Sequence, residues 1–312
     1  MTKSFFKSKR RILYATLSIM LYFFVLAEID RVTESVKSGL FFGGCVVVPT
    51  LFPFMILSDL ALSAVTSCQG DIKRRSLFSR ITHLPTVGRI ALFLGVLSGF
   101  PIGAKITAAL YEKGVLDRNE ATRLLVLSNH TGPAFLFGAV AGLFSNPNIP
   151  LLLVLCELLP TVIYAFWSGK EAVFDPIKEA ASSPTFCFSL IDSVEKAVFS
   201  VLKILGLIVT FRIIIDLSAV FFRSKLLLSI LSAFCEIGNA ASLTSELYRA
   251  CPAMALTVLA FAVSFGGISV HMQSFLFFRK KKISACRYLL SKFILGILSA
   301  AFMSILLYFF PV

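Results

Sequence analysis

Long apolar runs separated by short polar stretches are the feature that most restricts how this chain folds. Several runs approach or exceed the roughly 20 residues that a helix needs to cross a bilayer. Charged residues make up 15% of the 312 residues and hydrophobic residues 57%, which leaves too little charge to cover a soluble protein of this length. The runs are continuous rather than alternating, which argues against a β-barrel. We therefore predict an all-α polytopic membrane protein with about 8–9 membrane segments.

The basic residues lie in clusters between these runs, although the net charge of +13 at first suggests a nucleic-acid partner. The clusters fall at residues 7–11, 73–80 and 279–282. Because cytoplasmic loops of membrane proteins are enriched in Lys and Arg, we interpret the clusters as topology signals, with the lipid bilayer and no nucleic acid as partner. The uncharged run 12–27 follows the first cluster without a small-residue cleavage site. It predicts an uncleaved first helix with a cytoplasmic N-terminus, with a cleaved signal peptide as the alternative.

Signatures of soluble enzymes do not occur in the sequence. We find no Walker A loop, GxGxxG, HExxH or GxSxG pattern. The seven cysteines are scattered without a CxxC pair, so we interpret them as small buried apolar residues. We predict no enzyme activity, no catalytic residues, no metal and no cofactor. An ATP-driven pump would need another subunit to supply the ATPase.

One apolar run contains a stretch that favours a broken helix, LSGFPIGAK at 97–105. Pro101 removes a backbone donor and disfavours helical geometry at the residue before it, and glycines make unwinding inexpensive. Similar stretches occur at 129–133 (NHTGP), 231–239 (LSAFCEIGN) and 264–268 (SFGGI). We predict helix breaks at six positions, namely Pro101, Gly103, Gly132, Pro133, Gly266 and Gly267.

These stretches recur in the same order in the two halves of the chain. An offset of about 134 residues places LSGFPIGAK on LSAFCEIGN and SNHTGP on VSFGGI, and such collinear matches favour duplication. A third match, with a larger offset, places Pro53–Asp59 opposite Thr210–Asp216. The basic clusters lie at non-equivalent positions of the halves, which predicts inverted repeats with broken or re-entrant helices. The expected units are an N-terminal transmembrane helix (1–30), a first repeat (31–168), a linker (169–189) and a second repeat (190–312).

Polar side chains inside apolar runs are costly in a membrane, so each needs a partner, a wet cavity or a function. Lys105 either snorkels from a helix end or lines a cavity, and Glu157 either pairs with a lysine or carries protons. Arg212 and Asp216 are spaced to pair on one helix. Half-helix N-termini attract anions and unwound carbonyls coordinate cations. Lys105, His130, His271 and Arg212 would line a wet cavity between the breaks with cations and so favour a small anionic substrate, and a coupling ion is left open. The predicted substrate-binding residues are Lys105, Asn129, His130, Glu236, Asn239, His271 and Gln273.

The stretches SGFPIGAK, NHTGP, FCEIGN and SFGGISVHMQ resemble the YlbJ-type sporulation integral membrane proteins, which carry two nucleoside-recognition Gate domains. The resemblance covers residues 38–310 and implies two Gate-type repeats. It also implies a role in endospore formation, with dipicolinic acid moved from the mother cell toward the forespore. The implied location is the cell membrane or the outer forespore membrane. The chain departs from the family pattern at Asn129–Thr131 and at Arg212, so its substrate could differ.

Three functions are left open at this point. The first is a transporter or facilitator of a small organic anion, such as dipicolinate, and converging Lys105 and His271 side chains would favour it. The second is a non-transporting scaffold for spore assembly, which a dry interior with paired polar side chains would favour. The third is a nucleoside transporter, which an aromatic and amide-lined space without cations would favour. The oligomeric state is open, and an oligomer is compatible with each function.

Overall fold

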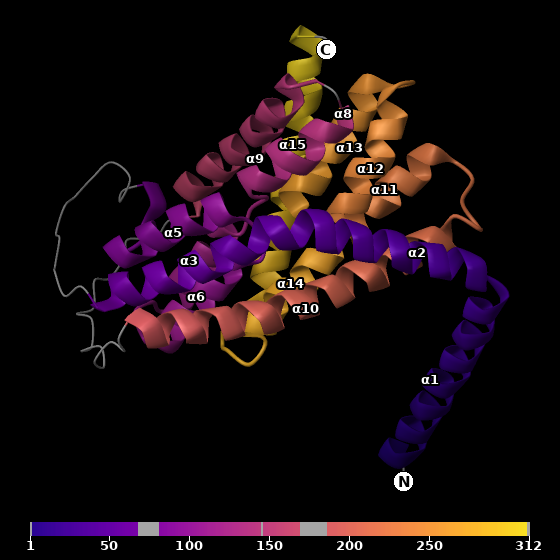
Figure 1. Cartoon of the computed structure of the whole chain (residues 1–312), viewed down its shortest axis with the longest axis horizontal. Helices are drawn as coiled ribbons and strands as arrows, with labels where there is room; N and C mark the ends of the chain where they lie inside the picture. The colour runs from indigo at the N-terminus through magenta and orange to yellow at the C-terminus, as the bar shows by residue number, and fades with distance from the viewer. Residues whose placement is uncertain (1, 68–80, 145, 169–185, 311–312) are drawn as a thin grey trace.

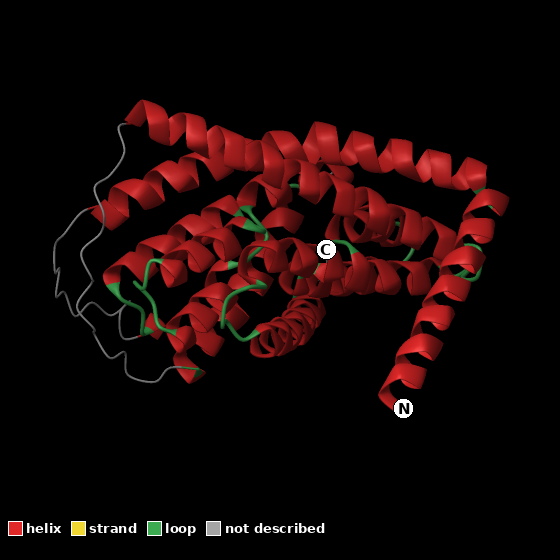
Figure 2. Cartoon of the chain, turned by 90° about the horizontal axis from the view of Figure 1, so that it is seen from below, coloured by secondary structure: helices red, strands yellow, loops and turns green. Residues whose placement is uncertain are grey.

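The computed structural model describes residues 2–67, 81–144, 146–168 and 186–310. Within these ranges the regular structure is entirely helical, with no strand (Figure 2). Four stretches are long and apolar enough to cross a membrane: Asn148–Trp167, Leu190–Ser218, Pro252–Phe278 and Ala285–Phe309. A fifth is the pair Ile29–Val47 and Leu51–Ala61, bent by 46°. The described residues thus show four or five candidate spans, compared with the expected total of about 8–9 membrane segments that included broken or re-entrant helices, because several other apolar helices are only 10–17 residues long.

The N-terminal region forms three successive helical segments. α1 (Thr2–Ala27) is a helix where the sequence predicts one, and it projects away from the body (Figure 1). After a turn the chain continues as α2 (Ile29–Phe42), a π-helical turn (Gly43–Val47) and α3 (Val48–Ser67). α2 and α3 both pack along α10 (Phe186–Ser218). Segments from the two halves of the chain are therefore in direct contact.

The first half contains two interrupted helices. α5 (Thr86–Ser98) ends at Gly99, and α6 (Ile102–Glu112) begins after Pro101. α7 (Arg118–Ser128) starts with a capping box between Asp117 and Glu120, as the sequence predicts. After an irregular stretch at 129–132, the chain resumes as a π-helical turn (Phe135–Val140) and α8 (Ala141–Phe144). α9 (Asn148–Trp167) completes this part.

The second half shows the same kind of interruption. α11 (Lys225–Cys235) is separated from α12 (Ile237–Tyr248) by Glu236, whose backbone is extended. α13 (Pro252–Phe265) ends at Gly266, which has φ of 90°, and α14 (Gly267–Phe278) follows directly. α15 (Ala285–Phe309) is continuous and packs on α13, α9 and α7.

The breaks pack in two pairs, the first on the second and the third on the fourth, through backbone contacts that leave no space for a side chain. A Cβ at Gly99 would lie 2.5 Å from Gly132 N, and one at Gly267 would lie 3.0 Å from the Cys235 carbonyl. Phe100 N donates to His130 O at 2.7 Å, so the first break satisfies part of the backbone of the second. Because lipid offers no hydrogen bonds, unwound backbone is tolerated in a membrane only when protein or a wet cavity covers it.

Three of the six predicted break positions lie in helices. Gly103 is in the first turn of α6, Pro133 is the first residue of a helical turn, and Gly267 is the first residue of α14. Pro133 fits there because the first residues of a helix need no intrahelical N–H donor. Gly103 is required by close packing, since a Cβ there would lie 2.4 Å from Ser128 O. Pro101, Gly132 and Gly266 lie in the interruptions themselves.

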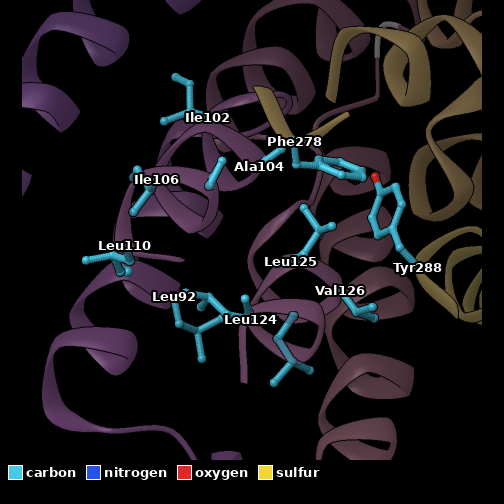
Figure 3. Packing of buried hydrophobic residues seen from close by; sticks show 14 of the residues in the cluster. Leu92, Ile102, Ala104, Ile106, Leu110, Leu124, Leu125, Val126, Phe278 and Tyr288 are labelled. Atoms are coloured by element: carbon cyan, nitrogen blue, oxygen red, sulfur yellow. The ribbon is translucent and has the colours of Figure 1, made fainter. Parts of the chain in front are cut away.

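The apolar core lies beneath the first two breaks, and other apolar side chains cover the outside. Figure 3 shows Leu124, Leu125 and Val126 of α7 packed between α5, α6 and the rings of Phe278 and Tyr288. These three α7 side chains are fully buried. The outer faces of α9, α10 and α15 carry exposed large apolar side chains, as expected for surfaces in contact with lipid. Most of the expected linker at 169–189 lies outside the described residues.

The contact between Gly103 and Ser128 gives a stability prediction. Gly103→Ala should lower the free energy of unfolding by about 1–3 kcal/mol, because its methyl group would overlap the Ser128 carbonyl. The matched control is Gly142→Ala in α8, where no atom lies within 4 Å of the new methyl group. Denaturant unfolding of both purified variants in detergent measures the difference. Equal stability of the two variants would contradict the packing described here.

Candidate functional site

A small cavity lies where the four breaks meet. It offers about 60 Å³ to the centres of water molecules, which is room for a few waters. Three of the breaks contribute residues to its wall, and α14, which follows the fourth break, contributes Val270 and Gln273. The polar or charged side chains in the wall are those of Ser98, Thr131, Glu236 and Gln273. The apolar part of the wall consists of Phe42, Val47, Leu51, Phe100, Ala134, Phe135, Ile208, Ile237 and Val270.

Glu236 lies in this wall at the start of α12. Its two carboxylate oxygens accept hydrogen bonds from Gly238 N (2.9 Å) and Asn239 N (2.7 Å). The carboxylate therefore caps α12 and is stabilised by the N-terminal end of the helix dipole. Gln273, from α14, donates to Ser269 Oγ at 3.2 Å. Glu236 and Gln273 thus present fixed polar groups to an otherwise mainly apolar space.

A second polar group lies close by, behind Phe100 and Thr131, and we name it the polar cluster. Glu157 of α9 accepts from Thr131 N (2.8 Å) and contacts His130 Nδ1 (3.1 Å). Asn129 donates from Nδ2 to Ser274 Oγ (2.9 Å) and to Tyr288 OH (2.6 Å). The full cluster is buried and consists of Asn129, His130, Glu157, His271, Ser274, Tyr288 and Lys292.

His271 joins the cluster from the fourth break. Its Nδ1 lies 3.2 Å from Tyr288 OH, and its ring packs edge-on against Phe265 with the centroids 4.7 Å apart. Its Nε2 has no partner among the described residues. Tyr288 and Phe265 therefore hold the imidazole ring in place, while its Nε2 makes no hydrogen bond to the described residues.

Lys292 is the functional candidate that sequence reasoning missed. It lies in α15, one turn after Tyr288, and is completely buried. Nothing in the described residues accepts a hydrogen bond from its Nζ, which lies 5.2 Å from the centre of the Phe100 ring. Its charge interacts electrostatically with Glu157, His130 and His271. A buried cation without a bonded counter-ion costs several kcal/mol, so this placement needs a functional explanation.

The seven predicted substrate residues do not form a single site. Glu236 and Gln273 line the cavity, whereas Asn129, His130 and His271 belong to the polar cluster. Lys105 pairs with Asp59 of α3 at 2.9 Å, outside the cavity wall. Asn239 accepts from Arg212, which also pairs with Asp216 as predicted (2.7 Å).

The predicted cation-lined cavity therefore needs correction. None of the side chains in the cavity wall is a cation, and neither Lys105 nor His271 is part of that wall. Two cations of the described residues lie near the wall: Arg212 interacts electrostatically with the wall residue Glu236, and Lys292 Nζ is covered by the Phe100 ring, which is part of the wall. A signal was present in the sequence, because Lys292 is an isolated lysine within the apolar run 284–310. Within the described residues no three His, Cys, Asp or Glu side chains gather to hold a metal ion.

Comparison with known proteins gives one informative relative. The sporulation integral membrane protein YlbJ of Bacillus subtilis (strain 168) is 27% identical over an alignment of 336 positions. The alignment covers 95% of this chain and 82% of the relative. No protein-family model matches the chain. No solved structure matches it either.

The pairing of Lys105 with Asp59 gives a second prediction. Lys105→Met should lower the free energy of unfolding by about 1–3 kcal/mol, because it leaves a largely buried carboxylate without this cation. Adding Asp59→Asn should restore part of the loss, since the second change removes the charge that Lys105 neutralises. A double-mutant cycle of unfolding free energies in detergent measures the coupling. Strictly additive effects would exclude a stabilising ion pair.

Proposed function

Taking its homology to the Bacillus subtilis sporulation protein as premise, we propose that this integral membrane protein acts in endospore formation as a transporter or facilitator of a small organic anion. The proposed substrate is dipicolinate, moved from the mother cell toward the forespore. The proposed location is the cell membrane or the outer forespore membrane, with the N-terminus in the cytoplasm. The proposal involves no catalytic step.

The observation that carries the proposal is the meeting of four helix breaks at one cavity next to a surplus buried cation. Broken helices at the centre of a membrane protein are typical of substrate sites in transporters. α12 begins at the cavity, at Ile237, with its N-terminus already capped by the Glu236 carboxylate. α6 begins two residues after Phe100 of the cavity wall, so the partial positive charge of its N-terminus lies near the cavity. Lys292 adds a full positive charge behind the Phe100 ring.

The small volume of the cavity indicates that this conformation is a closed one, without room for substrate. Space for a few waters does not admit an organic acid, so a substrate requires the walls to move apart. The moving parts would be the half-helices, whose breaks supply hinges. Alternating exposure of a central site through such half-helices is a mechanism that the broken-helix architecture supports.

We further propose that the two halves are inverted Gate-type repeats. In support, each half places an interrupted helix pair before a second break, and each places an acidic residue of a long helix next to the following half-helix. Asp59 pairs with Lys105 of α6, while Asp216 and Arg212 form a linked group with Asn239 of α12. These are the positions that the offset of the two halves matches. In this proposal these ion pairs hold the half-helices α6 and α12 in place, and a coupling ion binds at a different position.

A nucleoside transporter is the second candidate, because the cavity wall favours it. The wall combines Phe42, Phe100 and Phe135 with the carboxylate of Glu236 and the amide of Gln273, and it contains no cation. Aromatic faces and hydrogen-bonding groups suit a base and a sugar. The scaffold alternative draws support from the paired side chains, such as His130 with Glu157, but it gives no role to a buried, unpartnered Lys292.

Transport by the purified protein decides between these functions. We expect vesicles that contain only this protein to take up labelled dipicolinate and not uridine. Gln273→Leu should lower the uptake about tenfold or more, because it removes a polar group from the cavity wall. Thr257→Val is the control, since Thr257 pairs with Ser304 on an exposed surface. Uptake of uridine alone would establish the second candidate, and uptake of neither compound would favour the scaffold.

A further inference from the structure

Three buried side chains of the polar cluster present nitrogen atoms without partners. These atoms are Lys292 Nζ, His271 Nε2 and His130 Nε2. Among the described residues these nitrogens have no hydrogen-bond partner, and neither has one acceptor of the same cluster, Asn129 Oδ1. Elsewhere the buried Arg123 donates through Nη2 to the backbone carbonyls of Ile81 and Ala165, while its Nε is left without a partner in the described part of the chain. The polar cluster therefore combines full burial with unused hydrogen-bonding capacity, which is exceptional in folded proteins.

The hydrogen bonds around Tyr288 decide which of these nitrogens donates. Tyr288 OH accepts a hydrogen bond from Asn129 Nδ2, so its own proton is available for His271 Nδ1 at 3.2 Å. A neutral imidazole that accepts at Nδ1 carries its proton at Nε2. His271 Nε2 is then an unused donor, in addition to the three protons on Lys292 Nζ. His130 differs, because its Nδ1 lies 3.1 Å from the Glu157 carboxylate and so already has a charged hydrogen-bond partner.

Phe100 connects this pair of donors to the central cavity. Its ring forms part of the cavity wall, lies over Lys292 Nζ, and approaches Gly266, where an added Cβ would lie 2.9 Å from the ring edge. The residue belongs to the first break, between α5 and α6, where the backbone is not held by a continuous helix. Turning this one ring away would expose the ammonium group to the cavity.

We propose that Lys292 and His271 form a carboxylate-binding site behind Phe100. In the closed conformation the Phe100 ring covers the ammonium group, and in the loaded conformation a ligand carboxylate replaces the ring. Lys292 supplies the charge and His271 Nε2 the second hydrogen bond. The inference rests on the proposed function and extends it, because it assigns the substrate class to a specific pair of donors.

A carboxylate fits this site better than a cation or a neutral ligand does. Lys292 Nζ and His271 Nε2 are both donors and one of them carries a positive charge, so this pair would repel a cation. The unpartnered acceptor of the cluster is Asn129 Oδ1, whose amide group is held through Nδ2 by Ser274 and Tyr288. Glu157 is occupied by Thr131 N and His130, so it leaves the ammonium group without a direct bond. The aromatic rings of Phe100 and Phe265 border the donors. A flat organic acid would keep apolar contact with these rings while its charge reaches Lys292.

Ligand binding to the purified protein in detergent tests the site without transport. Benzoate is the probe, and benzamide, which has the same shape without the charge, is the matched control. We expect benzoate to bind and benzamide not to bind, in equilibrium dialysis with labelled compounds. Lys292→Met should weaken benzoate binding about 10- to 100-fold, as expected for loss of a charge-assisted hydrogen bond. Lys225→Met, which removes an exposed lysine paired with Glu246, should leave the benzoate affinity unchanged.

A charge-retaining variant and melting curves distinguish loss of the binding site from loss of the fold. Lys292→Arg retains the charge and should keep part of the affinity, and melting curves of each variant show whether it is folded. Equal benzoate affinity of the wild type and Lys292→Met, equal binding of benzamide, or competition by chloride as effective as that by dipicolinate would each overturn the carboxylate site. Dipicolinate uptake that persists in Lys292→Met would leave the proposed function standing without this site. Benzoate binding without uptake of any substrate would leave the site standing without the proposed function.

Discussion

The architecture depends on how unwound backbone is satisfied inside a membrane. Four helices are interrupted, and lipid cannot hydrogen-bond the groups that the interruptions release. The protein solves this by placing the breaks against one another, with Phe100 N donating to His130 O and Thr131 Oγ1 donating to Val263 O. The second of these bonds joins the two halves of the chain. A single break in lipid would leave backbone groups without hydrogen bonds. Because the breaks supply these bonds to one another, they lie together inside the protein.

The same requirement explains the positions of the buried acids. Glu236 accepts the backbone donors at the start of α12, and Glu157 accepts Thr131 N in the second break. Each carboxylate thus replaces water at backbone groups that a break leaves exposed. Their negative charges in turn allow cations nearby. His130 is held by Glu157 directly, whereas Lys292 feels the same charge only through space.

Much of this arrangement could be predicted from local sequence. The breaks at Pro101, Gly132 and Gly266 follow from the conformational properties of proline and glycine, and the Asp117 cap follows from the spacing of its partner. Gly103 could not be interpreted correctly from the sequence, because its requirement comes from the Ser128 carbonyl of another helix. The sequence did not separate complete membrane crossings from shorter segments, for a related reason. Hydropathy alone does not distinguish a half-helix from a full span.

The charged residues show most clearly where sequence reasoning fails. Lys105 stands beside a break, which made it a candidate ligand, yet Asp59 of a distant segment pairs with its charge. Lys292 stands in the middle of an unbroken apolar helix, which made it inconspicuous, yet its ammonium group has no hydrogen-bond partner among the described residues. The distinction depends on partners contributed by other helices, and these are set by tertiary packing. A cation is available to a ligand when the fold has left its charge uncompensated. In this fold that condition is met next to the cavity, behind one aromatic ring.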